Sequence, residues 1–199
     1  MRKLFLSTAV ILMASTSAFA APVVGEAAPV FTATDIQGVE HTLSDFQGKT
    51  VILEWNNPKC PYVVKHYDSG NMQSLQAEAT EAGAVWVTIN SGADGKQGHM
   101  TTDVANTTMT DLGFNGSAYI IDASGDIGKM YDAKTTPHMF VINPEGTLVY
   151  AGAIDSDPSF KQDGIASATN YVKAAWESVA NDEPVEVAST QAYGCSVKY

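Results

Sequence analysis

Cys60 is the residue whose type and position most clearly predict chemistry in this chain. It is one of two cysteines, and it follows the apolar run Val51–Trp55 and a turn-like segment at 56–59. Pro61 comes next and opens a stretch that can be helical. A cysteine at a helix start faces backbone N–H groups and the positive end of the helix dipole, which lower the pKa of a thiol. We therefore expect Cys60 to be a nucleophile rather than an inert core cysteine.

The second cysteine, Cys195, lies near the end of the chain, in the segment 193–197. Its spacing from Cys60 matches no zinc-binding pattern, so we expect no metal site. Cys195 could resolve Cys60 after Cys60 attacks a disulfide or is oxidised. It could instead hold the tail as a permanent staple, or remain free or paired with another molecule. We expect a Cys60–Cys195 disulfide, and its catalytic or structural role stays open.

The first 20 residues have the features of a secretory signal peptide. A basic start at Arg2 and Lys3 precedes an apolar run, and Ala18-Phe19-Ala20 matches the A-x-A cleavage pattern. We therefore expect cleavage after Ala20 and a periplasmic or secreted protein, with no membrane partner after cleavage. Two cysteines suit an oxidising compartment. The formal net charge of −11 argues against nucleic acid as a partner.

The hydrophobic pattern predicts alternating strands and helices. Strands are expected at 31–34, 41–43, 50–55, 84–90, 117–122, 139–143 and 147–153, the last two joined by a hairpin turn at 144–146. Helices are expected at 61–82, with a break at Ser69-Gly70, at 101–112 and at 162–180. The acidic segment after residue 181 is expected to be extended. This order of elements predicts an α/β sandwich with a central mixed β-sheet flanked by helices.

Three segments together resemble the thioredoxin-like superfamily, in its exported redoxin branch, which is similar to alkyl hydroperoxide reductase and thiol-specific antioxidant proteins. They are the strand at 51–55 leading through Lys59-Cys60-Pro61 into a helix, the segment 135–143 with Pro137, and the hairpin at 143–150. The resemblance covers about residues 24–179. It implies a thioredoxin-like domain over 21–180, after the signal peptide at 1–20, and a C-terminal tail over 181–199 that carries Cys195.

The chain departs from each well-defined branch of that superfamily. The C-x-x-C motif of thioredoxins is absent, because Val63 occupies the second cysteine position. The P-x-x-x-T/S-x-x-C motif of peroxiredoxins is replaced by Leu53 and Asn57, and the only arginine of the chain is Arg2. The copper-chaperone motif C-x-x-x-C-P lacks its first cysteine, since Asn56 stands there.

The resemblance also implies roles for residues around Cys60. Pro137 is expected to be a cis-proline, so that Thr136 offers its backbone to a substrate or to the sulfur. Glu54 lies six residues before Cys60, where thioredoxins place a buried acid that shuttles protons. The alternative for Glu54 is an exposed position at a strand edge. His66 is expected at the surface, and His138 is expected to face away from the thiol.

These residues favour an exported thiol-disulfide oxidoreductase or antioxidant with Cys60 as nucleophile and Cys195 as a possible resolving cysteine. Its partners would be a thiol or disulfide substrate and an external thiol electron donor, since no nucleotide or flavin motif is present and no cofactor is expected. The missing arginine favours a reductase over a peroxidase. The alternative is a non-catalytic binding or chaperone-like module with a structural Cys60–Cys195 disulfide.

Overall fold

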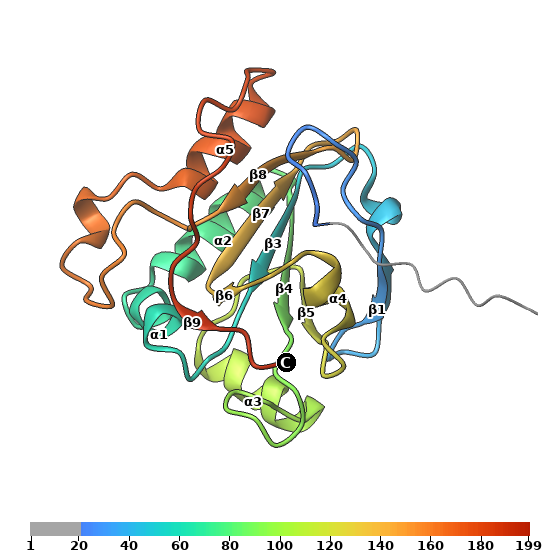
Figure 1. Cartoon of the computed structure of the whole chain (residues 1–199), viewed down its shortest axis with the longest axis vertical. Coiled ribbons are helices and arrows are strands. Elements are labelled where there is room, and N and C mark those ends of the chain that lie inside the picture. The colour runs from blue at the N-terminus through green and yellow to red at the C-terminus, as the bar shows by residue number, and fades with distance from the viewer. Residues whose placement is uncertain (1–20) are drawn as a thin grey trace, which may run out of the picture.

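The computed structural model describes residues 21–199, so the predicted signal peptide at 1–20 lies outside the described residues. A mixed sheet with the strand order β5-β4-β3-β7-β8 forms the centre of the molecule (Figure 1). Its strands are β3 (Val51–Trp55), β4 (Val85–Asn90), β5 (Ala118–Ile121), β7 (His138–Ile142) and β8 (Leu148–Gly152). Strand β3 pairs in parallel with β4 and antiparallel with β7. The predicted central position of the run at 50–55 is therefore confirmed.

Apolar side chains cover both faces of this sheet, because successive residues of each strand point to opposite sides. On one face, Ile52 and Met139 pack in a core with Cys60 and with the helices α1 (Pro61–Asp68), α2 (Asn71–Glu81) and α5 (Tyr171–Ala180). On the other face, Leu53 and Phe140 pack with α4 (Asp126–Met130) and the region of the hairpin formed by β1 (Thr32–Thr34) and β2 (Glu40–Thr42). The predicted α/β sandwich is confirmed.

Most element boundaries follow the sequence pattern. The predicted break between α1 and α2 is confirmed and falls at Gly70, whose φ of 74° lies in the left-handed region that glycine adopts readily. The helix predicted over 162–180 is wrong in its first half. Residues Ile165–Ser167 form only a 3₁₀ turn, η2, because Ala168 is extended and Asn170 caps α5 by accepting a hydrogen bond from the Lys173 N–H at 2.8 Å. Helix α4 was not predicted.

The remaining described elements are short or peripheral. Helix α3 (Thr102–Asp111) is capped by the Thr101 side chain, which accepts a hydrogen bond from the Val104 N–H, and it packs through Met109 against Tyr119 of β5. A 3₁₀ turn, η1 (Leu43–Phe46), follows β2. Neither α3 nor η1 carries a cysteine, so the positions of the two thiols depend on the central sheet, on α1 and on the tail.

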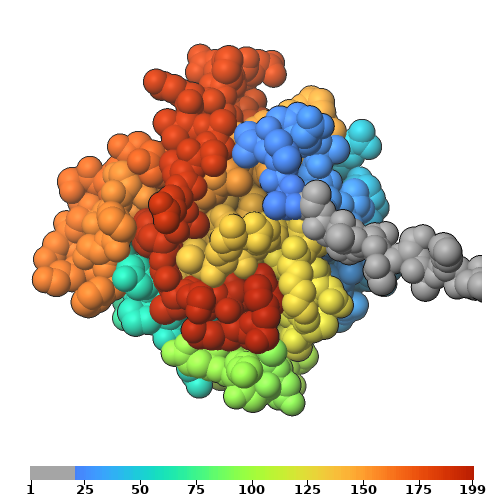
Figure 2. Space-filling model, in the orientation of Figure 1, coloured from blue at the N-terminus to red at the C-terminus, as the bar shows by residue number. Residues whose placement is uncertain are grey.

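The C-terminal tail is fastened along one side of the domain. It descends from α5, forms the short strand β9 (Cys195–Ser196) beside β6 (Thr135–Thr136) and ends near α4 (Figure 1). In the antiparallel pairing, Thr136 lies opposite Cys195. The Thr190 hydroxyl accepts a hydrogen bond from the Ala153 N–H at 2.9 Å, and the Tyr199 hydroxyl donates to the Ala133 carbonyl at 2.7 Å. Figure 2 shows the tail as a continuous band over this face.

Gly194 permits the close approach of the tail to the loop before Pro137. Its φ is +133°, a conformation that side chains with a Cβ rarely adopt. A Cβ atom at this position would overlap the carbonyl oxygen of Thr136. The residue next to Cys195 therefore has to be glycine for β9 to pair with β6.

We predict that Gly194→Ala displaces the tail and exposes Cys60. The added methyl group cannot fit against the Thr136 carbonyl, so Cys60 should react with a maleimide reagent about tenfold faster than in the unaltered protein. The matched control is Gly95→Ala, because Gly95 also has a positive φ but has no neighbour within 4 Å of its added Cβ. Equal labelling rates in the two variants would show that the tail does not cover Cys60.

Candidate active site

Cys60 stands at the position just before the first turn of α1, with Pro61 as the first helical residue. Strand β3 ends at Trp55, and the loop that follows is fixed by Asn57, whose side-chain oxygen accepts a hydrogen bond from the Lys59 N–H at 2.9 Å. The Cys60 side chain is 0% exposed. Its sulfur donates a hydrogen bond to the carbonyl oxygen of Thr136 at 3.1 Å. The predicted junction between a buried strand and a helix start is confirmed.

The pKa of Cys60 is lowered from the ordinary value of a cysteine. Burial alone raises it, since the charged form loses its water. Hydrogen bonds from the Cys195 and Thr136 side chains, and from the backbone N–H groups of Cys195 and Val63, outweigh the effect of burial. Each of these donors stabilises a negative charge on the sulfur. Together they take the place of the water that would otherwise solvate the thiolate.

Cys195 has the opposite character. The pKa of its thiol is raised to about 12, first by burial and then by the hydrogen bond and negative charge of Cys60, with a small opposing effect of Lys198. Cys195 is partly exposed, whereas Cys60 is not. Both residues are free thiols in the structure, so the disulfide between them stays a prediction. Their side chains are nevertheless in hydrogen-bond contact, and the Cys195 thiol is the donor when Cys60 is in its thiolate form.

The loop that faces Cys60 carries the two other residues singled out from the sequence. The Thr136–Pro137 peptide bond is cis, as predicted. The Thr136 backbone contacts the Cys60 sulfur through its carbonyl group and is covered by β9. The hydroxyl group of Thr136, which sequence reasoning did not consider, is buried and makes no hydrogen bond of ordinary length and angle among the described residues. Its looser interaction with the Cys60 sulfur is one of the causes that lower the pKa of that thiol.

Glu54 is 0% exposed, so the alternative of an exposed strand edge is wrong. Its carboxylate accepts hydrogen bonds from five side chains that surround it, on β4, α1, α2 and the residue that follows β3. The donors are Asn56 at 2.8 Å, Tyr67 at 3.0 Å, Gln76 at 3.2 Å, Trp86 at 2.9 Å and Thr88 at 3.0 Å. Neither cysteine is among them. Burial and the charge of Glu54 raise the pKa of Tyr67 well above its ordinary value, so that phenol remains a donor.

Two histidines lie near the thiols, and the structure contradicts the predicted position of one and confirms that of the other. His66 is fully buried, so the expected surface position is wrong. Burial and the adjacent Lys65 charge lower its pKa to about 3. His138 stacks on Phe140 at 4.5 Å between ring centroids, and Phe140 belongs to the core on the face opposite Cys60. The expectation that His138 faces away from the thiol is confirmed.

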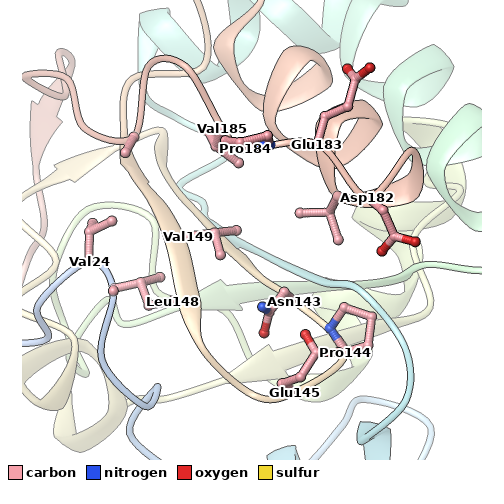
Figure 3. Close-up of a pocket in the computed structure, with 13 residues that line it drawn as sticks. Val24, Asn143, Pro144, Glu145, Leu148, Val149, Asp182, Glu183, Pro184 and Val185 are labelled. Atoms are coloured by element: carbon pink, nitrogen blue, oxygen red, sulfur yellow. The ribbon is translucent and has the colours of Figure 1, made fainter.

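Other parts of the described chain offer no competing centre for thiol chemistry. A pocket at the turn between β7 and β8 is lined by residues 143–145 and by the tail at 182–185, and its lining contains neither cysteine nor histidine (Figure 3). Within residues 21–199, no three histidine, cysteine or acidic side chains are grouped as metal ligands. In the same range, no helix has the length and apolar character needed to cross a membrane.

Sequence and structure comparisons agree with the class of protein that this fold and thiol pair define, a thioredoxin-like redoxin. The model of the AhpC/TSA family matches residues 24–151, which is more than half of the chain. The protein therefore belongs to the AhpC/TSA family. The match ends before the tail, so Cys195 lies outside the part of the chain that the family model covers.

Individual relatives are more distant. The thiol-disulfide oxidoreductase ResA of Bacillus subtilis is 26% identical over 132 residues, which cover 63% of this chain and 64% of that protein. The crystal structure of a hypothetical protein from Sinorhizobium meliloti shares the fold with a TM-score of 0.78 and 24% identity, over 90% of this chain and 96% of that one. The thioredoxin domain of a thiol-disulfide oxidoreductase from Bacteroides vulgatus has a TM-score of 0.51 and 19% identity, over 65% and 87% of the two chains.

We predict that Thr136→Val raises the pKa of Cys60. Valine fills nearly the same volume but cannot donate a hydrogen bond, so the thiolate loses one of its donors. The measurement is the pH dependence of thiolate absorbance near 240 nm in a Cys195→Ser background, compared with the same background carrying Thr136. An unchanged midpoint would show that the hydroxyl does not stabilise the sulfur.

We also predict that Glu54→Ala lowers the free energy of unfolding by about 3–5 kcal/mol, because five buried donors lose their acceptor. Glu54→Gln should cost less, since one oxygen remains. Urea denaturation measures both, with Glu81→Ala on the exposed end of α2 as the control. A loss of less than about 1 kcal/mol in Glu54→Ala would mean that the donors find other partners.

Proposed function

We propose that this protein is an exported thiol-disulfide oxidoreductase in which Cys60 is the nucleophile and Cys195 is the resolving cysteine. The observation that carries the proposal is the contact between a buried thiol of lowered pKa and a second thiol of raised pKa. The name of the ResA relative supports the same reaction class. The pattern predicted to be a signal peptide at 1–20 supports a periplasmic or secreted location.

The reaction follows from the difference between the two thiols. The Cys60 thiolate attacks a substrate disulfide, so that one substrate sulfur leaves as a thiolate and a mixed disulfide forms on Cys60. Cys195 then gives up its proton and attacks the Cys60 sulfur, which releases the second substrate thiolate and leaves a Cys60–Cys195 disulfide. Two electrons have moved from the protein to the substrate, and an external dithiol donor returns them.

The geometry favours attack of the donor on Cys195 in the return step. Cys195 is partly exposed and Cys60 is fully buried, so the donor thiolate has access to only one of the two sulfurs. Attack there expels Cys60 as a thiolate into the set of donors described above. A thiol with a lower pKa leaves faster, and the lowered pKa of Cys60 therefore helps the reduction of the disulfide.

A reductase fits the site better than a peroxidase. Residues 21–199 contain no arginine to polarise a peroxide. Asn57, at the position of the peroxiredoxin Thr or Ser, uses its side chain to fix the loop through Lys59 and Gln97. Thr136 and Pro137 are proposed to form the side of the site that meets the substrate. Glu54 is proposed to position the strands and helices around Cys60, since its contacts are structural.

We predict that Cys60→Ser reduces the rate of insulin disulfide reduction to that of the uncatalysed reaction. Cys195→Ser should still attack the substrate, but the mixed disulfide on Cys60 should accumulate and can be identified by mass spectrometry under non-reducing conditions. The two variants serve as controls for each other. Wild-type turnover in Cys60→Ser would refute the assignment of the nucleophile.

A further inference from the structure

The proposed chemistry leaves unused a polar cluster at the end of α1 farthest from Cys60. It consists of Lys65 and His66 on α1, Asp155 and Asp157 on the loop after β8, and Tyr193 on the tail. Lys65 and His66 are fully buried, and Asp155 is 3% exposed. Buried charges are costly unless they are paired and hydrogen-bonded, so each contact within the cluster matters.

Lys65 is held by the two acids. Its ammonium group donates hydrogen bonds to the Asp157 carbonyl at 2.9 Å and carboxylate at 3.1 Å, and lies 3.9 Å from an Asp155 carboxylate oxygen. These contacts join α1 to the loop that follows β8. The other oxygen of Asp155 accepts a hydrogen bond from the Asp157 N–H at 3.0 Å and can accept a second one from a further group.

Tyr193 supplies that group from the tail. Its hydroxyl donates to the second Asp155 oxygen and lies 3.3 Å from Nε2 of His66. The Asn71 side-chain nitrogen lies 2.9 Å from Nδ1 of the same histidine, which fixes the ring. The Lys65 ammonium also lies 5.6 Å from the centroid of the Tyr193 ring, within the range of a cation–π contact.

The same tail segment contacts both ends of α1. Tyr193 and Cys195 flank Gly194, and both side chains pack against the core cluster that contains Cys60 and residues of α1. Cys195 meets Cys60 at the start of the helix, and Tyr193 meets Lys65 and His66 in its last turn. The position of Cys195 over Cys60 is therefore coupled to the seating of Tyr193.

We propose that Tyr193 is a latch for the tail, because its hydrogen bond to Asp155 holds Cys195 against Cys60. Lys65 and His66 support this hydrogen bond. Release of Tyr193 from Asp155 exposes Cys60 to substrate. The inference rests on the proposed function and adds the step that must precede attack by a fully buried thiol. Tyr193 is thus a positioning residue that acts through the tail. The closed latch favours resolution and the open latch favours attack on a new substrate.

The first test is the reduction potential of the Cys60–Cys195 pair. Tyr193→Phe removes only the hydroxyl, so the tail loses the one of its anchors that lies nearest to Cys195, and the effective concentration of Cys195 at Cys60 falls. We expect the equilibrium constant for disulfide formation to fall about tenfold, which for this two-electron couple makes the potential about 30 mV less negative. Tyr171→Phe is the matched control, because no hydrogen bond of that hydroxyl occurs among the described residues.

The second test measures access to Cys60 directly. In a Cys195→Ser background, Tyr193→Phe should raise the rate of Cys60 alkylation by iodoacetamide about tenfold, and Tyr193→Leu should raise it further by also removing the aromatic contact with Lys65. Urea denaturation of each variant establishes that the domain is folded under the labelling conditions. An unchanged potential together with an unchanged labelling rate in Tyr193→Phe overturns the latch.

The two proposals fail in different ways. If Cys60→Ser keeps wild-type turnover, or if no Cys60–Cys195 disulfide forms at any redox poise, the proposed function and the latch for that reaction are both rejected. If turnover requires both cysteines but Tyr193→Phe behaves as Tyr171→Phe does, only the latch is rejected. If Tyr193→Phe shifts both the potential and the labelling rate in the expected directions, the latch is supported.

Discussion

The Cys60 sulfur has no contact with solvent, yet its surroundings favour a negative charge on it. The arrangement of the elements around Cys60 depends on this constraint. A buried thiolate has to exchange water for hydrogen-bond donors of the protein. Here the donors come from three places in the chain, namely the start of α1, the loop at Thr136 and the tail at Cys195. The central sheet places the first two beside each other, because β3 leads to Cys60 and its neighbour β7 follows Pro137. The tail completes the set.

The buried carboxylate of Glu54 also stabilises the elements that surround Cys60. Glu54 lies in an otherwise apolar strand, where an unpaired carboxylate would be strongly unfavourable. Its donors come from β4, α1, α2 and the residue after β3, so a single carboxylate connects its own strand with most of the elements around Cys60. The sequence places Glu54 at the spacing where related proteins have a proton-shuttling acid. In this chain, the five contacts favour a role in fixing the framework that carries the thiol.

Local patterns made the framework predictable, while the environment of the thiols depended on distant contacts. The apolar run at 51–55 and the turn at 143–146 each specify their structure within a few residues. Cys195 could not be placed, because a two-residue strand has no periodicity and β9 depends on Gly194 fitting against the Thr136 carbonyl. The burial of Lys65 and His66 could not be predicted, because their partners Asp157 and Tyr193 lie 92 and 127 positions away in the chain. The hydroxyl of Thr136 gave no signal in the sequence, since only the fold brings it to the sulfur.

The most direct test of the account is the reduction potential of the Cys60–Cys195 pair. Residues 21–199 are equilibrated in glutathione buffers, free thiols are trapped by alkylation, and the products are identified by mass spectrometry. The account predicts a disulfide with a potential of roughly −120 to −270 mV, the range in which thiol-disulfide oxidoreductases exchange electrons with their partners. A potential below about −300 mV would contradict it, because a bond that stable is a structural staple. That outcome would favour a binding module that retains the fold of a redoxin.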